Sequence, residues 1–497
     1  MYRWSFFKDE QLSFKFLSFV VFVKLAACAA YYWVYFVYYP IGQNGDSAST
    51  MHDAKIIYDA LPQKPLDYLK IIFGFHSESE ADPLYQTYFK QIEKWGRADV
   101  TSDFFLNDNR TPTRLNAIIM LFSFGYYSVH ALVMLVISFI GQLAFYKAFK
   151  SFFNGKEVLL ALIIFFSPSV LFWSSGVLKE PIALFLMGVF IYHFMQYFVN
   201  NQKNVLSILI MIVCSLLFLI LKPYIYLLIL LPLIIFTIVR AKQFKRVGLV
   251  YVFTLIFSVI AGAVILKTVF NKDVFNTIVV RENDFVSLSR GGIFFDNDSL
   301  YLRLEYKDST SYQLTDTANK LYTIKPHAQL MYWYLKNLKD TIFVNDNIDT
   351  TTLYKHLWTN APAGSAITMQ RLEYSFSSIA LFIPRAFYHV LCKPFFYDSR
   401  SVLEHLASFE NLLFLLFFIW CLWKPDYLHA DKKLLWFCIS IVVMSFILVG
   451  ITTTVMGAIV RYKVPFIPFL LMIPLLYLNP EKLKTVPILK RFFADKA

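Results

Sequence analysis

Apolar runs of about twenty residues recur along this chain and limit what it can fold into. An α-helix of that length spans the hydrocarbon core of a bilayer, which is about 30 Å thick. Of the 497 residues, 57% are hydrophobic and only 16% are charged, so a soluble enzyme with a membrane tail is excluded. We therefore expect an all-α polytopic membrane protein with about ten transmembrane helices and a small mixed extracytoplasmic appendage.

The basic residues set the expected orientation of these helices. Short loops rich in lysine and arginine lie on the cytoplasmic side of a membrane, and the strongest such loop runs from Arg240 to Arg246. Basic residues before the first span and in the C-terminal tail place both termini in the cytoplasm. The net charge of +13 belongs to this pattern, so we expect no nucleic-acid partner. The expected spans are residues 14–38, 128–149, 158–173, 181–199, 205–221, the run between Lys222 and Arg240, 247–269, 406–423, 434–452 and 458–478.

Polar segments between the spans suggest four regions. Residues 1–267 would form an N-terminal membrane bundle that includes a first outer loop, 41–114. Residues 268–376 mix acids, bases and aromatic residues, so we expect a small folded extracytoplasmic appendage. Residues 377–405 contain an apolar run that the alternation of sides does not allow to cross, and an interfacial or re-entrant segment fits it. Residues 406–497 would hold the C-terminal membrane helices and a cytoplasmic tail.

A short polar hinge, Ser174 to Glu180, joins two of the apolar runs. The hinge is too brief for a soluble loop, so we expect Lys179 and Glu180 at the outer rim of the bilayer. Charged groups are costly there and indicate a functional site unless they neutralise each other. Both interpretations remain open for this pair.

Three further charged residues are expected at the same rim: Asp46 after the first span, Lys222 before Pro223, and Arg461 inside the last apolar run. Cations can hold a phosphate on a lipid tail, and a carboxylate can act as general base on an incoming hydroxyl. Each residue also has a structural alternative. Asp46 could cap a helix, Lys222 could anchor the chain at the interface, and Arg461 could pair with a carboxylate.

The five cysteines lie in apolar segments and form no Cys-x-x-Cys motif or cluster with histidine. Their spacing predicts neither a disulfide framework nor a zinc site, and we expect no metal ligands among the site residues. The sequence leaves open whether a divalent cation serves as cofactor. His130 and His193 are expected to be packing residues inside spans, while Lys24 interrupts the apolar core of the first span.

Several short patches carry a resemblance to a known superfamily. The arrangement resembles the GT-C superfamily of integral-membrane glycosyltransferases, and more closely uncharacterised polytopic proteins of bacterial surface-polysaccharide loci. In that superfamily an acidic residue of the first outer loop serves as base or metal contact, and Asp46 matches this position, although Ser47 stands where a second acid is common. The matching patches are Gly45-Asp46, Tyr58-Asp59-Ala60, Ser167-Pro168-Ser169, Phe172-Trp173-Ser174-Ser175-Gly176, Lys179-Glu180, Lys222-Pro223-Tyr224 and Arg461-Tyr462-Lys463-Val464-Pro465 with Pro468.

The resemblance implies a glycosyltransferase of the bacterial inner membrane. It would move a sugar from a polyprenyl-phosphate-type donor to a surface-glycan or lipid-linked acceptor at the outer face. Asp46 would be the general base, Lys179, Lys222 and Arg461 would bind the donor phosphate, and Glu180 would orient Lys179.

Two other functions remain open. The first is an O-antigen-polymerase-like enzyme, which joins whole repeat units of polyprenyl-linked sugars. The second is a flippase or transporter of lipid-linked glycans, which charges in mid-membrane would favour.

Overall fold

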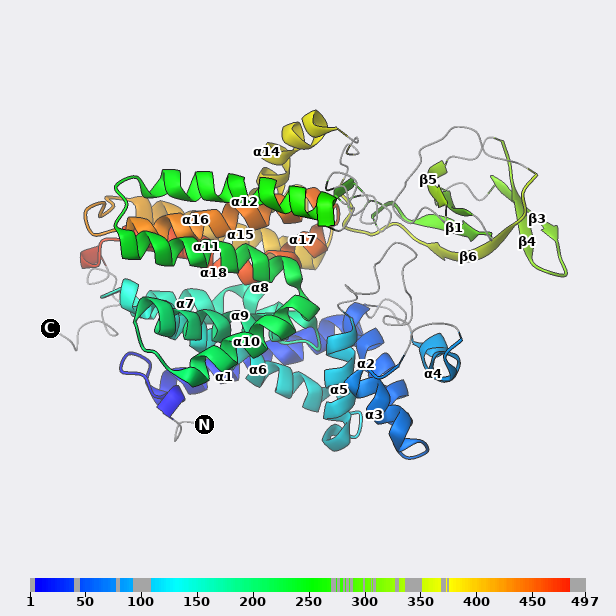
Figure 1. Cartoon of the computed structure of the whole chain (residues 1–497), viewed down its shortest axis with the longest axis horizontal. Coiled ribbons are helices and arrows are strands. Elements are labelled where there is room, and N and C mark those ends of the chain that lie inside the picture. Colours follow the sequence, from blue (N-terminus) through cyan, green and yellow to red (C-terminus); the bar gives the residue numbers. More distant parts are fainter. Residues whose placement is uncertain are drawn as a thin grey trace. The chain divides into compact units, whose positions relative to one another are not determined.

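The computed structural model is mostly helical and contains one small antiparallel sheet (Figure 1). It describes residues 5–39, 45–76, 81–92, 109–269 and 375–482 without interruption. Parts of three expected regions lie outside the described residues: 41–44, 77–80 and 93–108 of the first outer loop, much of 268–376, and 483–497 of the tail. Within 268–376 the additional described residues are 268–269, 274, 278–279, 282, 286, 289–297, 300–304, 306, 310–326, 330–335, 351–367, 372 and 375–376.

Eight of the described helical segments are long and apolar enough to cross a membrane. Each coincides with one of the expected spans. The segments are Phe14–Tyr38, Tyr127–Phe152, Lys179–Val199, Pro223–Lys242, Val247–Val264, Val402–Leu422, Lys432–Thr452 and Met456–Tyr477.

The other two expected spans form shorter helices. Residues 158–173 are divided into α7 (Glu157–Phe166) and α8 (Pro168–Trp173). The break follows from Pro168, which has no backbone N–H to continue the helix, and Ser167 Oγ donates a hydrogen bond to Ile163 O at 2.7 Å there. The second, α10 (Val205–Leu221), has 17 residues. Ten crossings remain a prediction that requires α7–α8 and α10 to cross as well.

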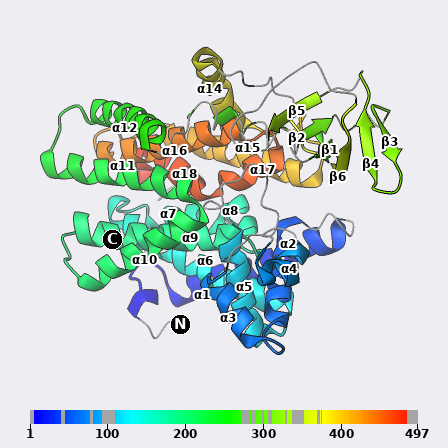
Figure 2. The same cartoon turned by 45° about the vertical axis from the view of Figure 1, so that its right-hand side comes forward.

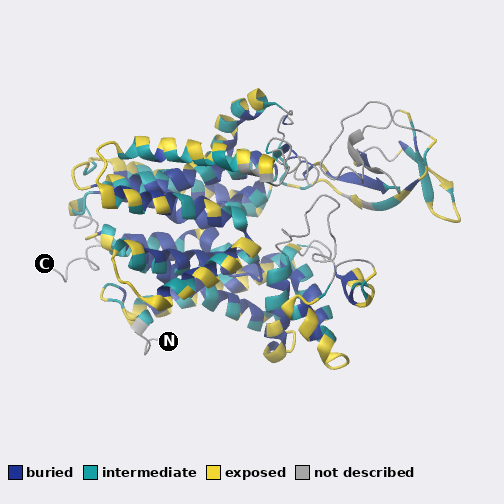
Figure 3. Cartoon of the chain, viewed as in Figure 1, coloured by how far each residue is buried: buried dark blue, intermediate teal, exposed yellow. Residues whose placement is uncertain are grey.

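The contacts divide the chain into two units. The first unit comprises Met1–Phe253, Leu413–Val442 and Val464–Ala497, and the second comprises Thr254–Leu412 and Val443–Lys463. Three of the four boundaries fall inside helices, namely α12 (Val247–Val269), α15 (Val402–Leu422) and α16 (Lys432–Thr452), and the fourth lies between Lys463 and Val464. Apolar side chains are exposed along α12 (Figure 3), as expected of a helix whose neighbours are lipid tails.

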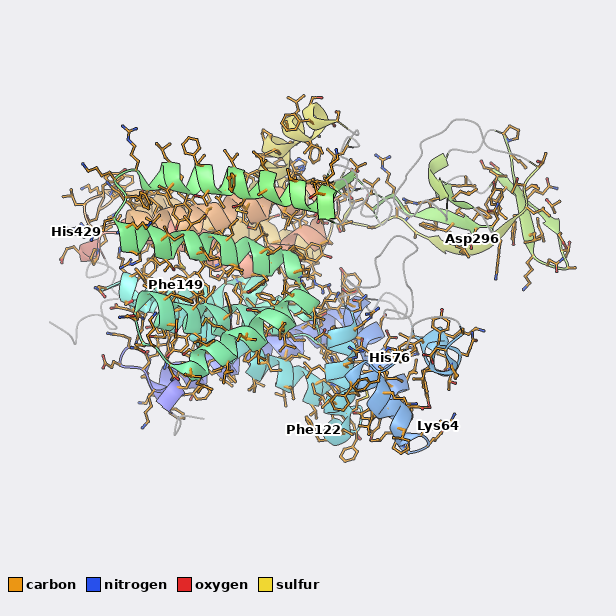
Figure 4. All side chains as sticks on the ribbon, viewed as in Figure 1. Lys64, His76, Phe122, Phe149, Asp296 and His429 are labelled. Carbon is orange, nitrogen blue, oxygen red and sulfur yellow. The ribbon has the colours of Figure 1, made fainter. Side chains whose placement is uncertain are left out.

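The first unit is built on the close contact of α6 (Tyr127–Phe149) and α9 (Lys179–Phe194). A Cβ atom on Gly188 would lie 1.9 Å from Gly141 O, so two glycines let the helix backbones touch. Helix α1 (Phe14–Trp33) packs on α6 and α8, α10 packs on α9 and on α11 (Pro223–Lys242), and α18 (Ile467–Tyr477) packs on α7. Phe149 lies in the interior (Figure 4), with ring contacts to Phe145 and Phe437.

Four helices of the first outer loop form a separate small cluster in the first unit. They are α2 (Gly45–Asp59), α3 (Pro65–Phe73), α4 (Pro83–Thr87) and α5 (Arg110–Ser123). Ile57, Ile71, Phe89 and Met120 are among the buried residues of their common core. This cluster gives α2 a fixed position, which matters because α2 carries Asp46.

The second unit contains a six-stranded antiparallel sheet in the order β3-β4-β6-β1-β2-β5. Strand β6, the last in sequence, is inserted beside β1, and Figure 2 shows these two strands together. Ile293, Phe295 and Tyr354 contribute to its small core. The strands are β1 (Gly292–Asp296), β2 (Leu300–Leu304), β3 (Tyr312–Asp316), β4 (Leu321–Ile324), β5 (Leu330–Leu335) and β6 (Tyr354–Asn360).

The helices of the second unit include α14 (Phe376–Cys392) and α17 (Met456–Tyr462). Helix α14 lies directly against α16, because a Cβ atom on Gly450 would be 2.3 Å from Ala386 O. Its other side is apolar and exposed, with Leu381 the most exposed member. The chain before α14 is tied to the chain before α17 by the hydrogen bond from Ile367 N to Thr454 O, 2.9 Å long.

Candidate functional site

The hinge between α8 and α9 is a buried polar turn. Residues 174–178 are all buried, and Gly176 is required because a Cβ atom there would lie 2.6 Å from the ring of Tyr31. The hinge carbonyls are satisfied by side chains: Ser138 Oγ donates to Ser174 O at 3.1 Å, and Ser47 Oγ donates to Val177 O at 3.0 Å. The hinge is thus held in one position by α2 and α6.

Asp46 lies half-buried in the first turn of α2, next to this contact. Ser47 Oγ also lies 2.9 Å from the hydroxyl of Tyr31, and because Ser47 gives its only hydroxyl hydrogen to Val177, Tyr31 donates this second bond. Ser47 stands at the position where a second acid is common in the superfamily that the sequence resembles. Its hydrogen bonds hold α2 against the hinge. The positive end of the helix dipole favours the ionised carboxylate of Asp46.

Glu180 and Lys222 form a buried ion pair in the first unit. Lys222 Nζ lies 3.0 Å from Glu180 Oε1, and both side chains are almost fully buried. The role of Glu180 in orienting Lys179 stays a prediction, although adjacent residues of a helix point in different directions. Glu180 faces inward at the start of α9, whereas Lys179 is half-exposed. Lys222 therefore neutralises at least part of the charge of Glu180 inside the protein.

Arg461 belongs to the second unit, in the last turn of α17, and is half-buried. Lys463, two residues later, is buried, and its Nζ donates to Asn411 Oδ1 at 2.9 Å. Asn411 Nδ2 in turn donates to the backbone carbonyls of Cys392 and Pro394, both at 3.3 Å. The Arg-Tyr-Lys patch thus contains one lysine that ties helix ends together and one arginine at the half-exposed end of α17.

Lys24, which from the sequence favours only the transporter alternative, is a buried cation. It is fully buried in α1, and its Nζ donates to Gln142 Oε1 at 2.9 Å and Ser174 Oγ at 2.8 Å. Among the described residues, no carboxylate lies within ion-pair distance of it. In the sequence, the sign that Lys24 is unusual is its position inside an apolar run. Its contact with the hinge could not be predicted, because this contact depends on the packing of α1 against α6 and α8.

His130 connects α5 and α6 through both ring nitrogens. Nε2 lies 2.7 Å from Ser123 Oγ, and Nδ1 lies 2.7 Å from Asn116 Oδ1. This order of groups resembles a nucleophile, base and orienting residue, but all three side chains are buried. No substrate can reach the hydroxyl of Ser123, so we interpret the trio as a structural contact at the corner between the two helices.

No group of three or more His, Cys, Asp or Glu side chains that could hold a metal ion occurs in the described part of the chain. The five cysteines are free. The chain matches no protein-family model, no curated protein and no solved structure. The fold is mostly helical, with eight candidate membrane spans and a small antiparallel sheet.

Proposed function

We propose that the protein is a GT-C-like membrane glycosyltransferase. It moves a sugar from a polyprenyl-phosphate-type donor to a surface-glycan or lipid-linked acceptor at the outer face of a bacterial inner membrane. The observation that carries the proposal is the 3.0 Å bond from Ser47 Oγ to Val177 O. This bond holds α2, which carries Asp46, against the hinge that precedes Lys179. The carboxylate of Asp46 and the lysine therefore belong to one packed part of the first unit.

In this proposal Asp46 is the general base. The acceptor hydroxyl oxygen forms a bond to the anomeric carbon of the donor sugar, and the bond from that carbon to the phosphate oxygen breaks. The hydroxyl proton passes to Asp46, and the bonding electrons leave with the phosphate. Positioned general bases typically contribute about 10²–10⁴-fold in rate.

Lysine and arginine side chains suit the phosphate of the donor. Lys179 is the lysine at the hinge with a half-exposed side chain, and Arg461 supplies a guanidinium suited to a bidentate phosphate contact. Lys222 contributes through its ion pair, because it neutralises Glu180 and so holds the first turn of α9 that carries Lys179. The ten crossings and cytoplasmic termini predicted from the basic loops would place these residues at the outer face.

A transfer assay tests the proposal. Membranes containing the full chain are given polyprenyl-phosphate-linked radiolabelled sugar, and labelled glycan is measured. We expect Asp46→Asn to lower the rate about 10²–10⁴-fold. We expect Arg461→Ala to lower it roughly tens- to hundreds-fold, the size of a lost hydrogen bond to a charged group. Asp316→Asn, which removes the half-exposed carboxylate at the end of β3, is the matched control. Full activity of both Asp46→Asn and Arg461→Ala would overturn the mechanism.

A second candidate, transport of a lipid-linked glycan, is favoured by Lys24. A charged residue inside a membrane span is costly and is commonly part of a substrate path, and Lys24 is fully buried in α1. A strain that lacks the protein distinguishes the two functions. Transport predicts that the intact lipid-linked substrate accumulates in the cytoplasmic leaflet, whereas transfer predicts accumulation of the donor in the outer leaflet.

A further inference from the structure

A polar cavity of about 110 Å³ lies within the second unit. It is lined by charged side chains from the segment between α14 and α15 and from the first turn of α15, by Ser365, and by Met456 at the start of α17. About 30 Å³ is the share of one water molecule in the liquid. The cavity therefore has room for three or four waters, or for the hydroxyl-bearing edge of one sugar ring.

Both walls of the cavity are held by hydrogen bonds. On one side Met456 N donates to Ser365 O at 2.8 Å, and the strand-like bridge between Ala366 and Val455 continues the contact. On the other side Asn411 Nδ2 holds Pro394 O at 3.3 Å, and Ser399 Oγ lies 2.7 Å from the hydroxyl of Ser408. The lining is therefore preorganised, as binding sites for small molecules are.

The charges that line the cavity balance. Lys393 Nζ lies 3.3 Å from Asp398 Oδ2, and the remaining two charged groups are Arg400 and Glu404. Two cations and two carboxylates give a net charge of zero. A phosphate dianion would find no excess of positive charge here, whereas a neutral polyhydroxyl group would find both donors and acceptors.

Glu404 has an incomplete set of partners. Its side chain is buried, with only 7% of the residue exposed, and Oε2 accepts a hydrogen bond from Arg400 N at 2.6 Å. Within the described part of the chain nothing donates to Oε1, and no cationic group forms an ion pair with the carboxylate. The guanidinium of Arg400 likewise makes no hydrogen bond to the described residues. Oε1 is not enclosed by the protein, so a ligand hydroxyl that enters the cavity can donate to it.

The segment that lines the cavity also carries an aromatic stack. The rings of Phe395 and Tyr397 lie 5.3 Å apart between centroids at an angle of 8°, and Tyr397 is 82% exposed. An exposed flat ring presents an apolar face with a polar edge, which suits the C–H face of a sugar.

We propose that this cavity binds the hydroxyl-bearing edge of a neutral sugar. A sugar hydroxyl donates to Glu404 Oε1, and neighbouring sugar oxygens accept hydrogen bonds from Arg400 and Lys393. The inference deepens the proposed glycosyl transfer by naming a sugar subsite, and it rests on that function only for the view that the ligand is a substrate. Binding itself is measurable without any transfer.

The test is direct binding of free sugars to the purified full chain in lipid nanodiscs. Saturation-transfer NMR is recorded with methyl glucoside, methyl galactoside and methyl N-acetylglucosaminide, each titrated to obtain a Kd. We expect at least one glycoside to bind. Glu404→Gln and Arg400→Gln should each raise its Kd at least fivefold, and Asp316→Asn should leave it unchanged. Melting temperatures equal to that of the wild type exclude misfolding of the variants. Because the side chain of Arg400 is exposed, Arg400→Gln still tests the proposal if Glu404→Gln is unstable.

Three outcomes would overturn the proposal: no glycoside binds, the Kd is the same in both variants, or inorganic phosphate displaces the glycoside, which would indicate an anion site. These failures are distinguishable from failure of the proposed function. If transfer proceeds but substitution of Glu404 or Arg400 leaves the Kd of the glycoside unchanged, only the proposed subsite is wrong. If the glycoside binds here and the transfer assay gives no product, the subsite stands and the transferase proposal fails.

Discussion

Lys222 Nζ lies 3.0 Å from Glu180 Oε1, and the two residues, 42 positions apart in sequence, bury their opposite charges together. Removing one member leaves the other charge buried and uncompensated, which typically costs about 3–5 kcal/mol. We therefore expect Glu180→Gln and Lys222→Met each to lower the free energy of unfolding, measured by detergent titration in mixed micelles, by about 3–5 kcal/mol. The double variant Glu180→Met with Lys222→Met should cost less than either single change, because no lone charge remains. Additive losses in the double variant would contradict this prediction.

Lys24 should behave differently, because it has no carboxylate partner among the described residues. Burying an unpaired charge is costly, so removing that charge offsets the loss of the hydrogen bonds to Gln142 and Ser174. We expect Lys24→Met to unfold at the same or a higher temperature than the wild type. The substitution also removes the donor to Ser174 Oγ, so transfer or transport should fall at least tenfold. A destabilised Lys24→Met with normal activity would indicate a purely structural lysine.

The contact between α6 and α9 should tolerate no side chain at Gly188. A methyl group there would meet Gly141 O at 1.9 Å, and relieving that overlap requires the two helices to separate. We expect Gly188→Ala to reduce the yield of folded protein severely, measured by size-exclusion chromatography. Gly262→Ala is the matched control, since a Cβ atom on Gly262 meets nothing within 4 Å in helix α12. The control should be neutral or stabilising by about 1 kcal/mol.

Ser47 and Asp46 are neighbours with separable roles. Ser47→Ala removes the hydrogen bonds to Tyr31 and Val177, which are made by two buried polar groups. A cost of about 1–3 kcal/mol in unfolding free energy is expected for each such group. Asp46→Asn should keep the free energy of unfolding and lose only transfer activity. Equal loss of stability in both variants would argue that Asp46 is a helix cap and not a base.

The expected positions of the spans depended on local information and agree with the structure in eight cases. The division of residues 158–173 into α7 and α8 was visible in principle, because Pro168 cannot continue a helix. For the candidate site the residue types were predictable, but their partners were not. Because Lys179 and Glu180 are adjacent, the sequence suggests that they pair with each other. In the structure Glu180 forms an ion pair with Lys222, the residue before α11.

The sequence by itself determined that this chain forms long apolar helices with charged groups gathered near their ends. The reason is that transfer into lipid depends on the sum of local hydrophobicity over about twenty residues. Only the tertiary structure decided which polar groups meet. The contacts of Ser47 with Val177, of Lys24 with Ser174 and of Glu180 with Lys222 join residues far apart in sequence. Each requires particular helix faces to pack, and hydrophobicity alone does not specify those faces.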